Sequence, residues 1–211
     1  MPSMQSGINH VHDYLVNFSS VGNNVTKFEV NDNVFDRLFV FPGAAIQASV
    51  HLRPMVSIDS THLKGQLLLL VSRDANNHII LLAFATVDKE YVRNWSWFFD
   101  CVLGCAPWLQ NHTVISDRAG SIISAMSTNW ADAQHVYCTW HIAQNMTRNR
   151  SVVFNKAARA CNEAEFDRFY AALSAVSPSV VNYLESGDLP RNKWTFYAST
   201  GVDSVTLHPI L

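Results

Sequence analysis

The sequence predicts a mixed α/β domain with a helical C-terminal extension, and three patterns in its 211 residues support this. Two apolar runs, at 66–72 and 78–87, flank a short polar turn, as the strands of a hairpin do. From Asn94 onward, apolar residues recur at helical spacing. Further short apolar runs then alternate with helical segments, which is typical of a sheet covered by helices. With 48% hydrophobic residues, the chain can bury a core without a disulfide scaffold.

The first half of the chain supplies a lead-in segment and three predicted strands. In residues 1–50, the polar clusters at 22–24 and 31–33 predict turns between short strands or helices. A short strand is expected at 55–59, and the hairpin of 66–72 and 78–87 follows it. A helix over 94–104 comes next, with Gly104 where a helix would end.

The second half alternates strands and helices. We expect strands at 113–117 and 135–138, and helices at 121–129, 140–160 and 163–176, with a break at Ser177-Pro178 and irregular structure over 187–211. Because the first three strands lack crossover helices, a purely parallel sheet is excluded. This element order is that of the ribonuclease H-like fold. We therefore predict a lead-in segment at 1–50, a ribonuclease H-like core at 51–145, and a helical insertion or extension at 146–211.

Charge and cysteine content bear on whether the chain binds nucleic acid and on the compartment in which it works. The chain has 15 Lys and Arg residues against 17 Asp and Glu residues, a formal net charge of −2. A strong grip on nucleic acid usually requires excess positive charge, so any such grip should come from a local patch or from a domain outside this chain. Four cysteines without regular spacing indicate a reducing compartment. We expect neither a signal peptide nor a membrane span.

Two aspartates are the main candidates for chemistry. Asp59 and Asp117 are each predicted to end a short strand. If those strands are neighbours, both carboxylates emerge at the same edge of the sheet, where they repel each other unless a cation lies between them. Mg²⁺ prefers such oxygen ligands, and two such ions can clamp the attacking and leaving oxygens of a phosphoryl transfer. The alternative is that each acid only caps a turn.

Five short sequence strings, taken together and in order, favour the metal-binding interpretation of the two aspartates over turn capping. They are DSTHLKG at 59–65, LAFA at 82–85, WSWF at 95–98, SDR at 116–118 and CTWH at 138–141. From about Phe35 to Trp194, the chain resembles the catalytic domain of Mutator-like element (MULE) transposases. The resemblance implies that Asp59 and Asp117 are the first two acids of a D-D-E triad holding Mg²⁺ or Mn²⁺. It also implies cutting of DNA at element ends, joining of 3′-hydroxyls to target DNA, and work in the nucleus, and it leaves a homo-oligomer open.

Five further residues are supporting candidates in this resemblance. His62 would contact substrate or support Asp59, or it is a plain turn histidine. Lys64 and Arg118 would meet DNA phosphate, or each balances the neighbouring aspartate. Cys138 and His141 match the family's C-x-x-H string, and His141 would point toward the acids or a phosphate. The alternative is ordinary packing and capping. No second ligand pair is present for them, so a zinc site is not expected.

The third acid is missing from its expected place. In the family it is a glutamate in a string that this chain lacks, so we expect the chain to stop short of it. Asp203 is a weak candidate for that role. Two other functions therefore remain open beside the enzyme. One is a domesticated, non-enzymatic transcription-regulator scaffold, and the other is an inactive, truncated transposon relic.

Overall fold

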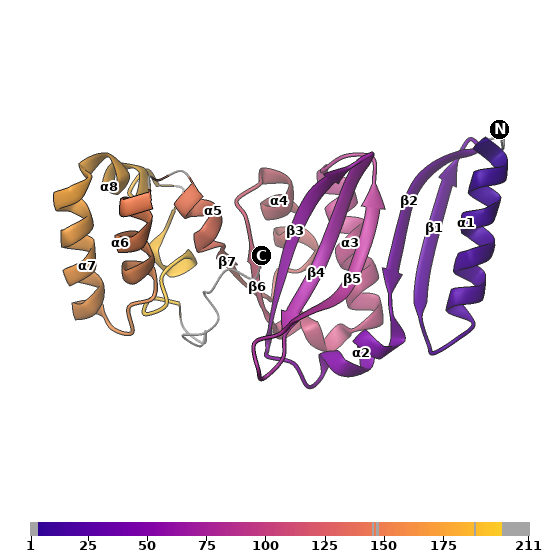
Figure 1. The fold of residues 1–211 in the computed structure, drawn as a ribbon, viewed down its shortest axis with the longest axis horizontal. Coiled ribbons are helices and arrows are strands. Elements are labelled where there is room, and N and C mark those ends of the chain that lie inside the picture. The colour runs from indigo at the N-terminus through magenta and orange to yellow at the C-terminus, as the bar shows by residue number, and fades with distance from the viewer. Residues whose placement is uncertain (1–3, 145, 147, 188, 200–211) are drawn as a thin grey trace. The chain divides into compact units, whose positions relative to one another are not determined.

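A computed structural model describes residues 4–144, 146, 148–187 and 189–199, and these form two compact units (Figure 1). Among the described residues, the first unit holds those in 4–112 and 119–133, and the second holds those in 113–118 and 134–199. Seven strands and eight α-helices lie in the described residues, in a mixed α/β fold compatible with the ribonuclease H-like prediction. None of the helices described is long and apolar enough to cross a membrane.

The first unit contains five antiparallel strands in the order β1-β2-β5-β4-β3. Their bounds are Val25–Asn31, Val34–Phe41, Met55–Leu63, Gly65–Arg73 and Ile79–Val87 for β1 to β5. Asp32 and Asn33 join β1 to β2 with φ values of 49° and 60°. Two positive φ angles fit a two-residue hairpin turn and suit these short polar side chains. The turns predicted at 31–33 and between β4 and β5 are confirmed.

The first unit has four α-helices, of which the third buries its apolar stripe. They are α1 (Met4–Ser19), α2 (Gly43–Ser49), α3 (Val92–Cys105) and α4 (Gly120–Asn129), with a 3₁₀ turn at Pro107–Asn111. The helical spacing that predicted α3 places Trp95, Phe98 and Phe99 entirely out of solvent. These rings are thus core residues, as their spacing suggests.

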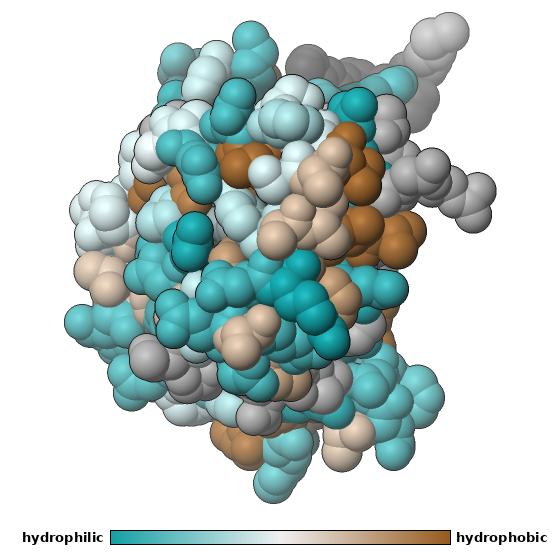
Figure 2. Space-filling view, turned by 90° about the vertical axis from the view of Figure 1, so that its left-hand side faces the viewer, coloured by the Kyte–Doolittle hydropathy of each residue, from teal (hydrophilic) through white to brown (hydrophobic). Residues whose placement is uncertain are grey.

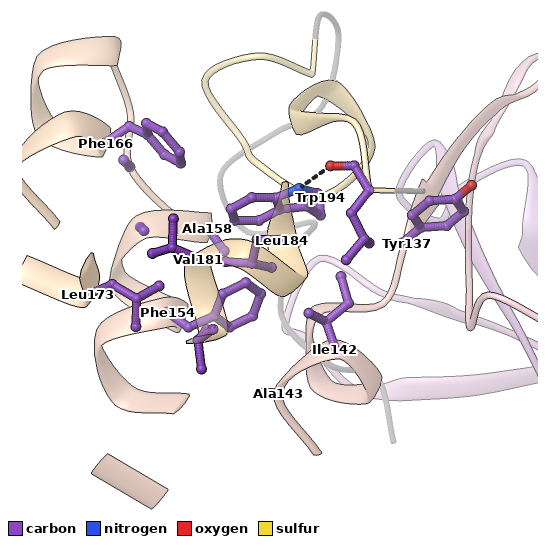
Figure 3. Close-up of a cluster of buried hydrophobic side chains, with 14 residues drawn as sticks. Tyr137, Ile142, Ala143, Phe154, Ala158, Phe166, Leu173, Val181, Leu184 and Trp194 are labelled. Carbon is purple, nitrogen blue, oxygen red and sulfur yellow. Dashed lines mark hydrogen bonds between the residues drawn. The ribbon is translucent and has the colours of Figure 1, made fainter. Parts of the chain in front are cut away.

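The second unit combines a parallel strand pair with a cluster of helices. Its elements are β6 (Thr113–Ser116), β7 (Gln134–Tyr137), α5 (Thr139–Gln144), α6 (Arg148–Ala158), α7 (Glu163–Val176), α8 (Pro178–Leu184) and a 3₁₀ turn at Arg191–Lys193. Figure 3 shows its core, in which the Trp194 ring stacks on Phe154 with centroids 5.2 Å apart. The indole N–H of Trp194 donates to the carbonyl of Leu189 over 3.1 Å, so its polar edge is also satisfied.

Two local predictions were wrong. The strand predicted to end at Asp59 continues as β3 to Leu63, because its backbone stays paired with β4 until the tight turn at Lys64. The single helix expected over 140–160 is divided into α5 and α6. For β3, apolar spacing indicated where burial changes, and pairing with β4 decided where the strand ends.

The lead-in segment contributes more than turns. Residues 34–41 pair with β5 as β2, so this part of the chain extends the same antiparallel sheet as the predicted hairpin. The antiparallel arrangement of β3, β4 and β5 agrees with the three-stranded start that we expected. The domain boundaries at 50 and 145 stay a prediction.

Candidate functional site

Asp59 occupies the point where β3 leaves the core. The four residues before it, Met55–Ile58, are buried, whereas Asp59 and Ser60 are half-buried and the following three are exposed. Oδ1 of Asp59 accepts the backbone N–H of Ser60 over 2.8 Å. A carboxylate held this way is oriented by its own strand and still reaches solvent, as a metal ligand must.

His62 and Lys64 lie further along the same hairpin, toward its tip. Both side chains are exposed, and Nδ1 of His62 accepts from the side-chain amide of Gln66 across the strand pair over 3.1 Å. Gly65 has a φ of +122°, and a Cβ there would lie 2.6 Å from the carbonyl oxygen of Val87. The glycine of the DSTHLKG string is therefore needed for the turn that presents Lys64.

Asp117 follows β6 directly, after four buried residues, and is half-buried. Its backbone carbonyl accepts the hydroxyl of Ser116 over 2.6 Å. The same hydroxyl oxygen lies 2.7 Å from Nε2 of His135, which donates to it because the hydroxyl proton is already used. Lys193 Nζ in turn donates to the carbonyl of His135 over 2.9 Å. Three residues thus support the backbone at Asp117.

His135 is a neutral group in this network. Burial, aided by the positive charge of Lys193, lowers the pKa of His135 from 6.5 to about 4. Sequence reasoning missed both His135 and Lys193. No role was expected for either residue, and the parallel pairing of β6 with β7 brings the strand of His135 beside that of Ser116.

Arg118 is held by the helical part of its own unit. Its guanidinium donates to the hydroxyl of Tyr183 on α8, and its Cζ lies 5.4 Å from the centre of that ring. Tyr183 is also a residue that sequence reasoning missed, since 65 positions separate it from Arg118. Arg118 is therefore positioned beside Asp117 by a tyrosine as well as by the chain.

Cys138 and His141 lie where β7 turns into α5. The backbone N–H of Cys138 donates to the carbonyl of Ser116 over 2.7 Å, so Cys138 follows β7 beside the residue that precedes Asp117. Cys138 is a free, half-buried thiol. His141 is half-buried in α5, with its ring 4.9 Å from that of Trp140. The C-x-x-H string therefore begins at the same strand ends as Asp117.

The structure thus gathers the candidates into two groups. Asp59, His62 and Lys64 share β3 and its turn in the first unit, whereas Asp117, Arg118, Cys138 and His141 surround the ends of β6 and β7 in the second. Asp203 lies outside the described residues. Within the described ranges, no three His, Cys, Asp or Glu side chains are grouped as metal ligands.

A comparison with protein families bears on this arrangement. Residues 55–145 match the MULE transposase domain. The resemblance drawn from the five strings is thereby confirmed for this segment. The matched MULE segment covers less than half of the chain and includes every candidate from Asp59 to His141, but not Asp203. No curated protein matches the chain.

Proposed function

We propose that this chain carries the core of a DNA-cleaving and strand-joining transposase, in which Asp59 and Asp117 hold a divalent metal ion, Mg²⁺ or Mn²⁺. The observation that carries the proposal is the MULE match, which spans both aspartates. Each is the first half-buried residue after four buried strand residues, one in β3 and one after β6. Such half-buried carboxylates are partly open to solvent, and carboxylate oxygens are ligands that Mg²⁺ prefers.

The donor set fits a hard cation in part. Two carboxylates supply oxygen ligands, and Mg²⁺ commonly takes one or two carboxylates together with substrate phosphate oxygens. When bound, the metal would supply positive charge for the attacking and leaving oxygens of an in-line phosphoryl transfer. Asp203 stays our candidate for the third acid of the triad.

The chain's own cations would act on the DNA backbone. Lys64 is exposed at the tip of the β3–β4 hairpin, where an ammonium group is accessible to phosphate. Arg118 is oriented by Tyr183 and offers further guanidinium N–H groups for a phosphate next to Asp117. The substrate would be the ends of an element and its target DNA, and the place of action the nucleus.

The experiment is a calorimetric Mn²⁺ titration of the whole chain near neutral pH, with Asp59→Asn, Asp117→Asn and Asp203→Asn beside it. Asp167→Asn, an exposed carboxylate on α7, is the matched control. We expect the first two variants to lose binding and the control to keep it. Weakened binding in Asp203→Asn would support its role as the third ligand.

Equal binding by wild type, Asp59→Asn and Asp117→Asn would refute the metal assignment. So would an absence of binding by the wild-type chain. In either case, the chain would still resemble MULE transposases, but it would lack the proposed metal-dependent DNA cleavage. The chain would then fit the non-enzymatic scaffold or the inactive relic better than the enzyme.

A further inference from the structure

A groove with mixed polar and apolar walls runs along α6 in the second unit. It consists of two adjoining hollows of about 350 and 470 Å³ that share Asn155. Hollows of this size fall in the range of about 300–1,000 Å³ that is usual for ligand clefts. We call this feature the α6 groove and define it by the residues Trp140, Ser151, Asn155, Lys156, Arg159 and Phe169.

The chain around the α6 groove is locally basic, although the whole protein has a net charge of −2. Residues 140–162 contain four cations, Arg148, Arg150, Lys156 and Arg159, and no Asp or Glu. Glu165 also lines one hollow, but its carboxylate accepts the backbone N–H of Cys161 over 2.9 Å at the start of α7. Among the residues that line the two hollows, Lys156 and Arg159 are cationic and Glu165 is anionic, so the lining carries a small excess of positive charge that can attract a phosphate backbone.

Two of these cations face the groove. Lys156 is exposed, and its Nζ lies 5.9 Å from the ring centre of Phe169. Arg159 is half-buried, and among the described residues its Nε has no hydrogen-bond partner. Both side chains line the hollow, where an ammonium or a guanidinium group can pair with a phosphate oxygen.

An exposed indole borders the other hollow. Trp140 keeps 41% of its surface in solvent, close to the 38% of Trp108, whereas Trp95, Trp130 and Trp194 are at most 1% exposed. Its position is also informative, because it follows Cys138 by two residues, and Cys138 is hydrogen-bonded to the backbone beside Asp117. Trp140 is therefore linked through Cys138 to the backbone beside Asp117.

We propose that the α6 groove binds a single strand of DNA, with phosphates at Lys156 and Arg159 and an unstacked base on Trp140. Aromatic platforms beside cations are how proteins hold single strands, because every base has a face that can stack. A base in a regular duplex could not lie flat on Trp140 without leaving its stack. Figure 2 shows that hydrophilic side chains predominate on the side of the second unit that is turned to the viewer. The inference rests on the proposed function and adds the form of its substrate.

The test measures the binding of a fluorescent 20-nucleotide single strand, and of its duplex, by anisotropy in EDTA over a range of salt. Trp140→Ala should weaken single-strand binding roughly 5- to 150-fold, the range for one lost base stack, and Trp140→Phe should restore most of it. The double variant Lys156→Gln/Arg159→Gln should lower the slope of log K against log salt by about 1.4, since each phosphate contact contributes about 0.7.

Arg191→Gln is the matched control, because it removes one cation from the same unit outside the groove. Arg191→Gln should leave the affinity for the single strand almost unchanged. It should also leave the slope of log K against log salt almost unchanged. Circular dichroism melts of each variant confirm that it is folded. A wild-type chain that binds no single strand, or Trp140 and Lys156/Arg159 variants that bind as well as Arg191→Gln, would overturn the proposal. So would tighter binding of polyglutamate than of DNA, which would indicate an acidic protein partner.

EDTA separates this test from the metal titration. If the groove variants fail to affect DNA binding while Mn²⁺ binding needs both aspartates, only the groove assignment is wrong. If DNA binding follows the groove residues while no metal binds, the strand-binding surface stands and the catalytic proposal falls.

Discussion

Acid should destabilise the fold through His135, the neutral imidazole behind Asp117. Its pKa is about 4 in the folded chain, because burial and Lys193 disfavour the charged ring, whereas an unfolded chain restores a value near 6.5. Between these values the unfolded state binds more protons, so the free energy of unfolding falls as the pH falls. The contribution is fully present above pH 6.5 and is lost progressively toward pH 4.

With these two pKa values, lowering the pH from 7 to 5 should cost about 2 kcal/mol of stability through this residue. For a chain of this size, that corresponds to a fall in Tm of roughly 4–8 °C. The assay is thermal or urea unfolding at both pH values, for wild type and for His135→Gln, which cannot gain a proton. His112, whose pKa is also lowered by burial, contributes equally to both proteins. If both lost the same stability between pH 7 and pH 5, the reasoning would be refuted.

Three further substitutions test the packing that supports the site. Gly65→Ala should lower the free energy of unfolding by about 1–3 kcal/mol, because the φ of Gly65 is +122° and the new Cβ would lie 2.6 Å from the Val87 carbonyl oxygen. In the same urea titration, the control Gly104→Ala should cost no stability, because a Cβ there meets open space. Trp194→Ala should lose about 3–5 kcal/mol, since it empties the centre of the second unit's core, and a loss below 1 kcal/mol by calorimetry would contradict that packing. Asn162→Ala removes the side-chain cap of α7 and should cost about 1 kcal/mol in a thermal melt, whereas an unchanged Tm would argue against the cap.

Elements whose signal is local could be predicted from the sequence. The helix expected at 163–176 is α7, with the same bounds, because its apolar stripe, its acidic first turn and the break at Ser177-Pro178 agree. The β4–β5 hairpin likewise follows from two apolar runs and a polar turn. Asp59 and Asp117 could be selected because each follows a buried strand segment and belongs to a family string.

Contacts between distant parts of the chain could not be predicted. The end of β3 depends on its partner β4, so the change from apolar to polar residues at Asp59 misplaced it by four residues. Tyr183 contacts Arg118 from 65 positions away, and no spacing rule connects the two. His135 has no pattern of its own and acts through the hydroxyl of Ser116, 19 positions earlier.

The same long-range contacts make the helical unit part of the support for Asp117. The segment 113–118 packs with residues 134–199, so the backbone at Asp117 depends on His135, and His135 on Lys193. Lys193 directly precedes Trp194, whose ring lies in the core of that unit. The packing of Trp194 therefore holds the backbone of Lys193 in place. Loosening this core should therefore disturb the backbone at Asp117. By this reasoning, a Trp194 variant that still folds should bind Mn²⁺ more weakly than wild type, and one that binds equally well would separate the core from the proposed site.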